Sequence, residues 1–74
     1  MNFTVEVEQE EDGRWLSEVA ELPGALAYGQ TREEAIARVQ ALALRVVADR
    51  LEHGESVPQM ATVFSAIIGG RTGR

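Results

Sequence analysis

The sequence predicts an α+β domain in which a small, mainly antiparallel sheet packs on one long helix. Residues 3–9 alternate between apolar and polar side chains, which is typical of a strand with one buried face. Residues 32–53 carry an apolar pattern with helical spacing, and residues 60–68 are almost wholly apolar. The expected order is β-β-β-α-β in a single domain of residues 1–68, followed by a flexible tail at residues 69–74.

A hairpin is expected at the start of the chain. The first strand has Phe3, Val5 and Val7 on one face and Thr4, Glu6 and Glu8 on the other. Asp12-Gly13 separates this run from the second strand at residues 15–19, and Asp-Gly between two strand-like runs is a strong hairpin signal.

A tight turn and a short third strand come next. In Leu22-Pro23-Gly24, the proline fixes φ and the glycine permits the positive φ that a type II turn requires. Residues 25–28 are long enough for a short strand, and Gly29 allows the chain to turn into the helix.

The helix has clear signals at both ends. Thr31 and Glu34 form a capping box at its start, and Gly54 supplies a C-terminal cap after His53. Pro58 confirms that the helix has ended. The apolar run from Met60 to Ile68 predicts a fourth strand that is covered on both faces.

The helix is more apolar than one small sheet requires. Its apolar positions cover about two-thirds of the circumference, where a surface helix needs only about 100°. Strand ends and loops could cover the remainder, but a second protein surface explains it better. We expect a homodimer or a higher even oligomer, with Leu42 or Leu44 and Phe64, in the last strand, at the subunit interface.

Composition limits the possible functions. The chain has 74 residues and no cysteine, so neither a disulfide nor a thiolate metal site can stabilise so small a core, and oligomerisation is a common remedy. The net charge of −5 opposes binding to nucleic acid, whereas the acidic first half suits a basic protein partner. Neither a membrane-spanning run nor a signal peptide is evident, so a cytoplasmic location is expected.

Catalysis is not expected. Glu6, Glu8 and Glu10 lie on one strand face, but their alternation is that of a solvated face, and no carboxylate from the helix interior joins them. His53 in the last helical turn is expected to interact with free carbonyl groups. We therefore predict no cofactor and no metal site.

Three residues are candidates for binding a partner. Trp15 and Tyr28 are aromatics with a polar group, a class that dominates interface hot spots, although both could equally belong to the core. Pro23 shapes its turn first and makes a contact second.

The motifs of residues 12–35 form an ordered set. They are Asp12-Gly13, Trp15, Leu22-Pro23-Gly24, Gly29 and the helix start from Thr31 to Ala35. This set resembles the HicB-like antitoxin family over about residues 3–53. The resemblance implies a degenerate RNase H-like fold that binds and neutralises a small basic RNA-cleaving toxin of the HicA type, in a type II toxin–antitoxin system.

The chain looks like a short form of that family. Longer HicB proteins carry a DNA-binding domain after the fourth strand, and this sequence ends near that point, so direct binding to nucleic acid is not implied. Two alternatives stay open: an orphan homo-oligomeric domain without a toxin, and a degenerate metal-dependent nuclease.

Overall fold

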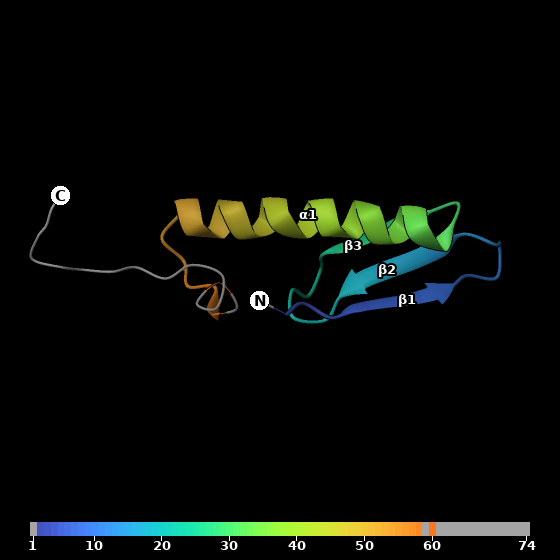
Figure 1. Ribbon diagram of the computed structural model, residues 1–74, viewed down its shortest axis with the longest axis horizontal. Helices are drawn as coiled ribbons and strands as arrows, with labels where there is room; N and C mark the ends of the chain where they lie inside the picture. The colour runs from blue at the N-terminus through green and yellow to red at the C-terminus, as the bar shows by residue number, and fades with distance from the viewer. Residues whose placement is uncertain (1, 59, 61–74) are drawn as a thin grey trace, which may run out of the picture.

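The computed structural model describes residues 2–58 and 60. It contains three strands, β1 (Val5–Gln9), β2 (Trp15–Val19) and β3 (Leu26–Gly29), followed by the helix α1 (Arg32–Glu52). The strands form one antiparallel sheet in the order β1-β2-β3, and α1 lies across one face of it (Figure 1). The predicted α+β class, a small antiparallel sheet packed on one long helix, is confirmed.

The β1–β2 hairpin turns where the sequence predicts it. The Glu10 amide donates to the Arg14 carbonyl at 2.7 Å, and the Gly13 amide donates to the Glu10 carbonyl at 2.9 Å. Gly13 closes the three-residue connection between the strands. Its φ of 93° is a backbone conformation that other residues rarely adopt. The Asp12 carboxylate fixes the turn further, because it accepts from the Arg14 amide at 3.0 Å.

A turn at residues 22–25 and a close helix approach position β3. The Ala25 amide donates to the Leu22 carbonyl at 2.9 Å, and Gly24 has a φ of 93°, as the predicted type II turn requires. β3 starts and ends one residue later than predicted. At its end, a Cβ on Gly29 would lie 2.5 Å from the Ala35 nitrogen, so only glycine lets the helix start this close to the sheet.

Capping defines both ends of α1. The Thr31 hydroxyl accepts from the Glu34 amide at 3.0 Å, and the Glu34 carboxylate accepts from the Gln30 amide at 2.6 Å. The Glu34 carboxylate therefore bonds the amide of Gln30, the residue before the N-cap, and not the amide of the N-cap Thr31 as in a standard capping box. The helix ends within one residue of the predicted boundary, followed by Gly54 with a φ of 76°.

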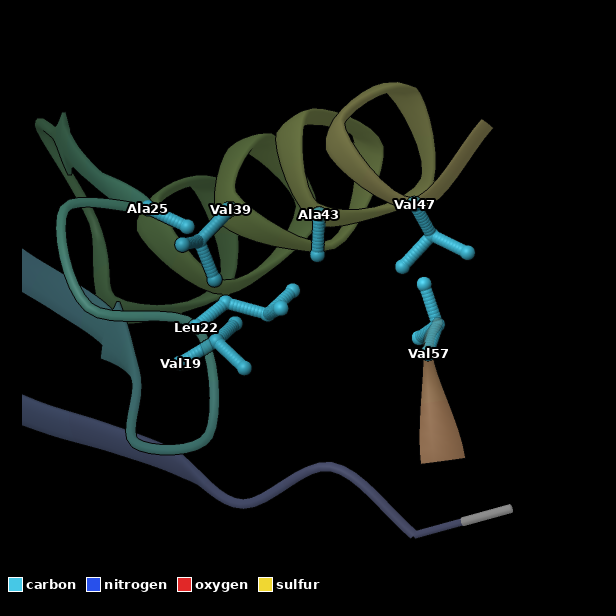
Figure 2. Packing of buried hydrophobic residues seen from close by; sticks show 7 residues of the cluster. All are labelled: Val19, Leu22, Ala25, Val39, Ala43, Val47 and Val57. Carbon is cyan, nitrogen blue, oxygen red and sulfur yellow. The ribbon is translucent and has the colours of Figure 1, made fainter. Parts of the chain in front are cut away.

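The core lies between α1 and the sheet. The helix buries one stripe with a spacing of four residues, made of Ala35, Val39, Ala43 and Val47. Val19, Leu22 and Ala25 pack against it from the sheet and its turn (Figure 2). Ser17 is fully buried there, and its hydroxyl donates to the Ala35 carbonyl at 2.7 Å, which ties β2 to the first turn of α1.

The helix is longer than the sheet that it covers. Its 21 residues span about 31 Å, whereas a five-residue strand spans about 17 Å. The second half of α1 therefore extends past the strands, and Val57 packs near Val47 there (Figures 1 and 2).

The predicted fourth strand is described only at its first residue. Met60 lies in a turn, because its amide donates to the Val57 carbonyl at 2.9 Å, and its side chain packs against the core. The strand therefore does not begin at Met60. Residues 61–68 and the predicted flexible tail at residues 69–74 lie outside the described residues.

Candidate protein-binding surface

Among the residues that the structure describes, no helix lies over the face of the sheet opposite α1 (Figure 1). Strand alternation puts Ser17 and Val19 toward the helix, so their neighbours in the strands point the other way. We call this surface the acidic sheet face; it consists of Glu6 and Glu8 of β1, Leu16 and Glu18 of β2, and Leu26 and Tyr28 of β3.

The strand register arranges these six residues in two rows. One row runs from Glu6 to Glu18 to Leu26, and the other runs from Glu8 to Leu16 to Tyr28. Glu6 and Glu18 are therefore direct cross-strand neighbours, and like charges in such positions destabilise a sheet by roughly 0.2–1 kcal/mol. This arrangement does not serve the stability of the isolated sheet.

Apolar side chains lie exposed beside these carboxylates. Leu26 is 42% exposed and Tyr28 is 38% exposed, while Leu16 between the strands is half-buried. Glu6, Glu8, Leu16 and Glu18 line a shallow depression of about 250 Å³. An apolar strip with a carboxylate rim is complementary to a basic surface that carries some apolar side chains.

One cation of the protein itself already occupies part of this face. The Arg14 guanidinium lies 4.4 Å from the centre of the Tyr28 ring, in the geometry of a cation–π contact. Its Nε also pairs with the Asp12 carboxylate at 2.7 Å. Hydrogen bonds from the Arg14 backbone and then its side chain lower the pKa of Asp12. The Tyr28 ring is thus presented as a surface that accepts a guanidinium group.

At the opposite end of the sheet, a second carboxylate joins the segment before β1 to the loop after β2. Glu21, in the loop after β2, accepts from the Thr4 amide at 2.7 Å and from the Thr4 hydroxyl at 2.9 Å. These bonds lower the pKa of Glu21. Sequence reasoning missed this contact, because two polar residues 17 positions apart carry no local signal of pairing.

The three predicted partner-binding residues do not share one surface. Tyr28 belongs to the acidic sheet face. Trp15 is half-buried and lies on the helix side of β2 with Ser17, and Pro23 is exposed in the turn at the far end of the sheet. Sequence reasoning did not single out Leu16 and Leu26, although antiparallel pairing combined with alternation places them beside Tyr28.

Carboxylates gather on this face without forming a metal centre. Among residues 2–58 and 60, no three histidine or acidic side chains are placed to hold a metal ion together. His53 lies at the helix end as predicted, with its Nδ1 2.8 Å from the Asp49 carbonyl oxygen.

The helix carries the residues predicted for a subunit interface. Leu42 is half-buried and packs against the core, whereas Leu44 is 59% exposed. Leu44 also borders an apolar groove of about 320 Å³ between α1 and β1, which Phe3, Val5, Val19, Gln40 and Ala43 line as well. Phe64 lies outside the described residues.

Comparison with known proteins gives one relative and no matching architecture. No family model and no solved structure matches the chain. The chain is similar to a UPF0150 protein of Thermoplasma acidophilum, with 29% identity over 59 residues, which cover 80% of this chain and 86% of that protein. In the described residues, no helix has the length and apolar character to cross a membrane.

Proposed function

We propose that this domain is a HicB-like antitoxin that binds and neutralises a small basic RNA-cleaving toxin of the HicA type. The acidic sheet face is the observation that carries this assignment. It combines exposed Leu26 and Tyr28 with three carboxylates on a sheet face that α1 leaves open. Glu6 and Glu18 are like charges in direct cross-strand positions there, and a cation from a partner would relieve their repulsion.

Charge distribution favours a basic partner at this face. The residues before α1 carry seven acids, namely Glu6, Glu8, Glu10, Glu11, Asp12, Glu18 and Glu21, against Arg14 alone. Such a field attracts a basic protein and accelerates its association. The motifs of residues 12–35 resemble HicB-like antitoxins, and the similarity to a UPF0150 protein extends over four-fifths of this chain.

Neutralisation would occur by covering the toxin rather than by chemistry on it. A toxin that cleaves RNA needs a basic surface, because affinity for RNA comes largely from lysine and arginine contacts to phosphates. The acidic sheet face competes for that surface with its carboxylates, and Tyr28 accepts a guanidinium group in place of Arg14. The domain would act in the cytoplasm, on the toxin and not on nucleic acid.

Self-association forms the second part of the proposed function. Leu44 is exposed on α1, on a different element from the acidic sheet face. A homo-oligomer held through the helix therefore leaves the sheet face free for the toxin.

Co-expression tests the toxin-binding function. The small basic protein encoded beside this gene is induced alone, with the wild-type domain, and with a Glu6→Lys/Glu18→Lys variant. We expect growth arrest by the toxin, relief by the wild type, and no relief by the variant. Glu33→Lys/Glu55→Lys is the matched control, because it makes the same charge change at exposed positions away from the acidic sheet face and should still relieve the arrest.

Two outcomes would contradict the assignment. One is the absence of a small basic protein encoded next to the gene. The other is relief that the double lysine variant preserves. An orphan homo-oligomer without a toxin would then account better for the domain.

A nuclease assay tests the proposed lack of catalysis. The purified domain with Mg²⁺ or Mn²⁺ should leave RNA and RNA–DNA hybrids intact, because the carboxylates serve as charges. Cleavage that Glu6→Gln or Glu8→Gln abolishes would instead assign these residues to metal-dependent catalysis.

A further inference from the structure

A second apolar stripe runs along α1 outside the buried stripe, and its Leu44 borders the groove between α1 and β1. It consists of Ala37, Ala41, Leu44, Ala48 and Leu51, all of them exposed, with Leu44 at 59% and Leu51 at 47%. We call it the Ala/Leu stripe. Its spacing alternates between four and three residues, the heptad spacing by which two helices pack side by side. The buried stripe that faces the sheet is separate from it.

The helix has no net formal charge. Its four arginines, Arg32, Arg38, Arg45 and Arg50, are balanced by Glu33, Glu34, Asp49 and Glu52. The residues before it have a formal charge of −6, from seven acids and Arg14. Two copies therefore repel each other least when helix meets helix. This charge pattern favours the stripe as the contact between two copies, and it opposes a contact at the acidic sheet face.

We infer that two copies pair through the Ala/Leu stripe with their helices antiparallel. This inference rests on the proposed self-association and specifies its geometry. One register places a leucine against an alanine for four of the five members: Leu44 of one copy against Ala48 of the other, and Leu51 against Ala41, while Ala37 lies beyond the end of the partner helix. Large side chains then fill the space that small ones leave, and the helix dipoles oppose each other favourably.

The charged residues beside the stripe agree with the same register. Arg38 of one copy comes beside Glu52 of the other, and the two-fold symmetry makes this contact twice. Arg38 already donates to the Tyr28 carbonyl at 3.0 Å and pairs with the Glu34 carboxylate at 3.4 Å, but a guanidinium has five N–H donors and can serve a third partner. Arg45 comes near Arg45 of the other copy at the two-fold axis, and the repulsion between these like charges opposes the pairing locally.

The pairing places the acidic faces at the two outer surfaces. Each sheet packs on the buried stripe of its own helix, and the acidic sheet face lies on the far side of that sheet (Figure 1). Two helix layers separate the sheets by more than a Debye length of about 8 Å. Each copy therefore keeps its own basic partner site.

Light scattering on the full chain tests whether the protein associates at all. We expect a dimer at about 100 µM that dissociates on dilution, because a single helix pair is at the small end of specific interfaces. Leu44→Glu should weaken the dimer by roughly tenfold or more, whereas Leu26→Glu, a matched change on the acidic sheet face, should not. A monomer at that concentration overturns both the self-association and its geometry.

Cysteine cross-linking tests the geometry separately. Ala41→Cys and Leu51→Cys chains should form a disulfide when mixed under oxidation, but neither should cross-link alone. In the antiparallel register, identical positions lie about 15 Å apart along the axis, too far for a disulfide. Cross-linking of each variant alone, or a dimer without the mixed disulfide, overturns the antiparallel pairing and leaves the self-association standing.

A charge reversal tests the register. Glu52→Arg should weaken the dimer several-fold because it opposes Arg38, and it should not harm the helix, since a cation suits a helix C-terminus. Adding Arg38→Glu should restore dimerisation by recreating the pair with its signs exchanged. Arg45→Gln should strengthen it. A double variant as weak as Glu52→Arg alone would overturn the register.

Discussion

The acidic sheet face and the Ala/Leu stripe differ in charge although both are exposed and partly apolar. The first sets carboxylates beside Leu26 and Tyr28, and the second is a row of alanine and leucine on a helix with no net formal charge. The acidic sheet face lies on the side of the sheet away from α1, and the Ala/Leu stripe lies outside the helix stripe that packs on the sheet. We propose two different occupants for them, a basic protein in the first case and an identical copy in the second.

This contrast shows that charge decides what an apolar surface accepts. Burial of leucine side chains stabilises any contact to a similar degree, because the hydrophobic effect is not directional. Charged neighbours then select the partner by repelling the wrong one. In the proposed function, the cross-strand pair of Glu6 and Glu18 would have this role on the sheet.

The largest expected effect separates the two leucines of α1. Leu42→Glu should destabilise the fold by about 2–4 kcal/mol, because it forces a charge against the core, and so small a domain should then be largely unfolded. Leu44→Glu should change monomer stability by less than about 0.5 kcal/mol, because the side chain is exposed. Thermal denaturation followed by circular dichroism measures both. Equal destabilisation would remove the distinction between core and stripe.

Salt should affect the two surfaces differently. Toxin binding at the acidic sheet face should weaken by roughly tenfold between low and high salt, since ions screen the charges that attract a basic partner. The helix dimer should respond little, because its contacts are mainly apolar. Titration calorimetry for the toxin and light scattering for the dimer measure this at matched salt concentrations. A parallel response would show that both contacts depend on charge.

Glu18→Lys should stabilise the domain while abolishing toxin binding. It replaces the repulsion with Glu6 by an attraction, which we expect to add about 0.5–1 kcal/mol and to raise Tm by about 2–6 °C. Glu8→Lys is the matched control: it should also abolish binding, but without the gain, because Glu8 faces Leu16. A lower Tm for Glu18→Lys would show that the acidic pair is not strained.

The smallest effect concerns pH. The bonds from Thr4 hold the pKa of Glu21 below its ordinary value of 4.5, so the folded state favours the charged carboxylate. Its contribution to stability is therefore present above that pH and is lost as the pH falls further. Glu21→Gln should lower Tm at pH 7 and make less difference at pH 3, with Glu11→Gln in the hairpin loop as a control. An equal loss at both values would assign the effect to shape rather than to charge.

Local signals predicted the elements well, because their causes are local. Gly13, Thr31 and Gly54 set the hairpin and both helix ends through contacts within four residues. The partner surface was harder to predict, because it depends on which strand residues become neighbours. Trp15 and Tyr28 look alike in the sequence, yet the sheet places them on opposite faces. The helix pattern likewise left Leu42 and Leu44 equivalent until the position of the sheet decided between them.

We expect the two halves of α1 to differ in local stability. The first turns are tied to the sheet by Ser17 and by the close approach at Gly29, whereas beneath the final turns the described residues place Val57 and no strand. Amide hydrogens near Leu51 should therefore exchange with solvent through local fraying, well before the sheet opens. A second helix packed along these final turns would slow that exchange at high protein concentration. The rate of amide hydrogen exchange in the last helical turns would thus report, residue by residue, whether two subunits have associated.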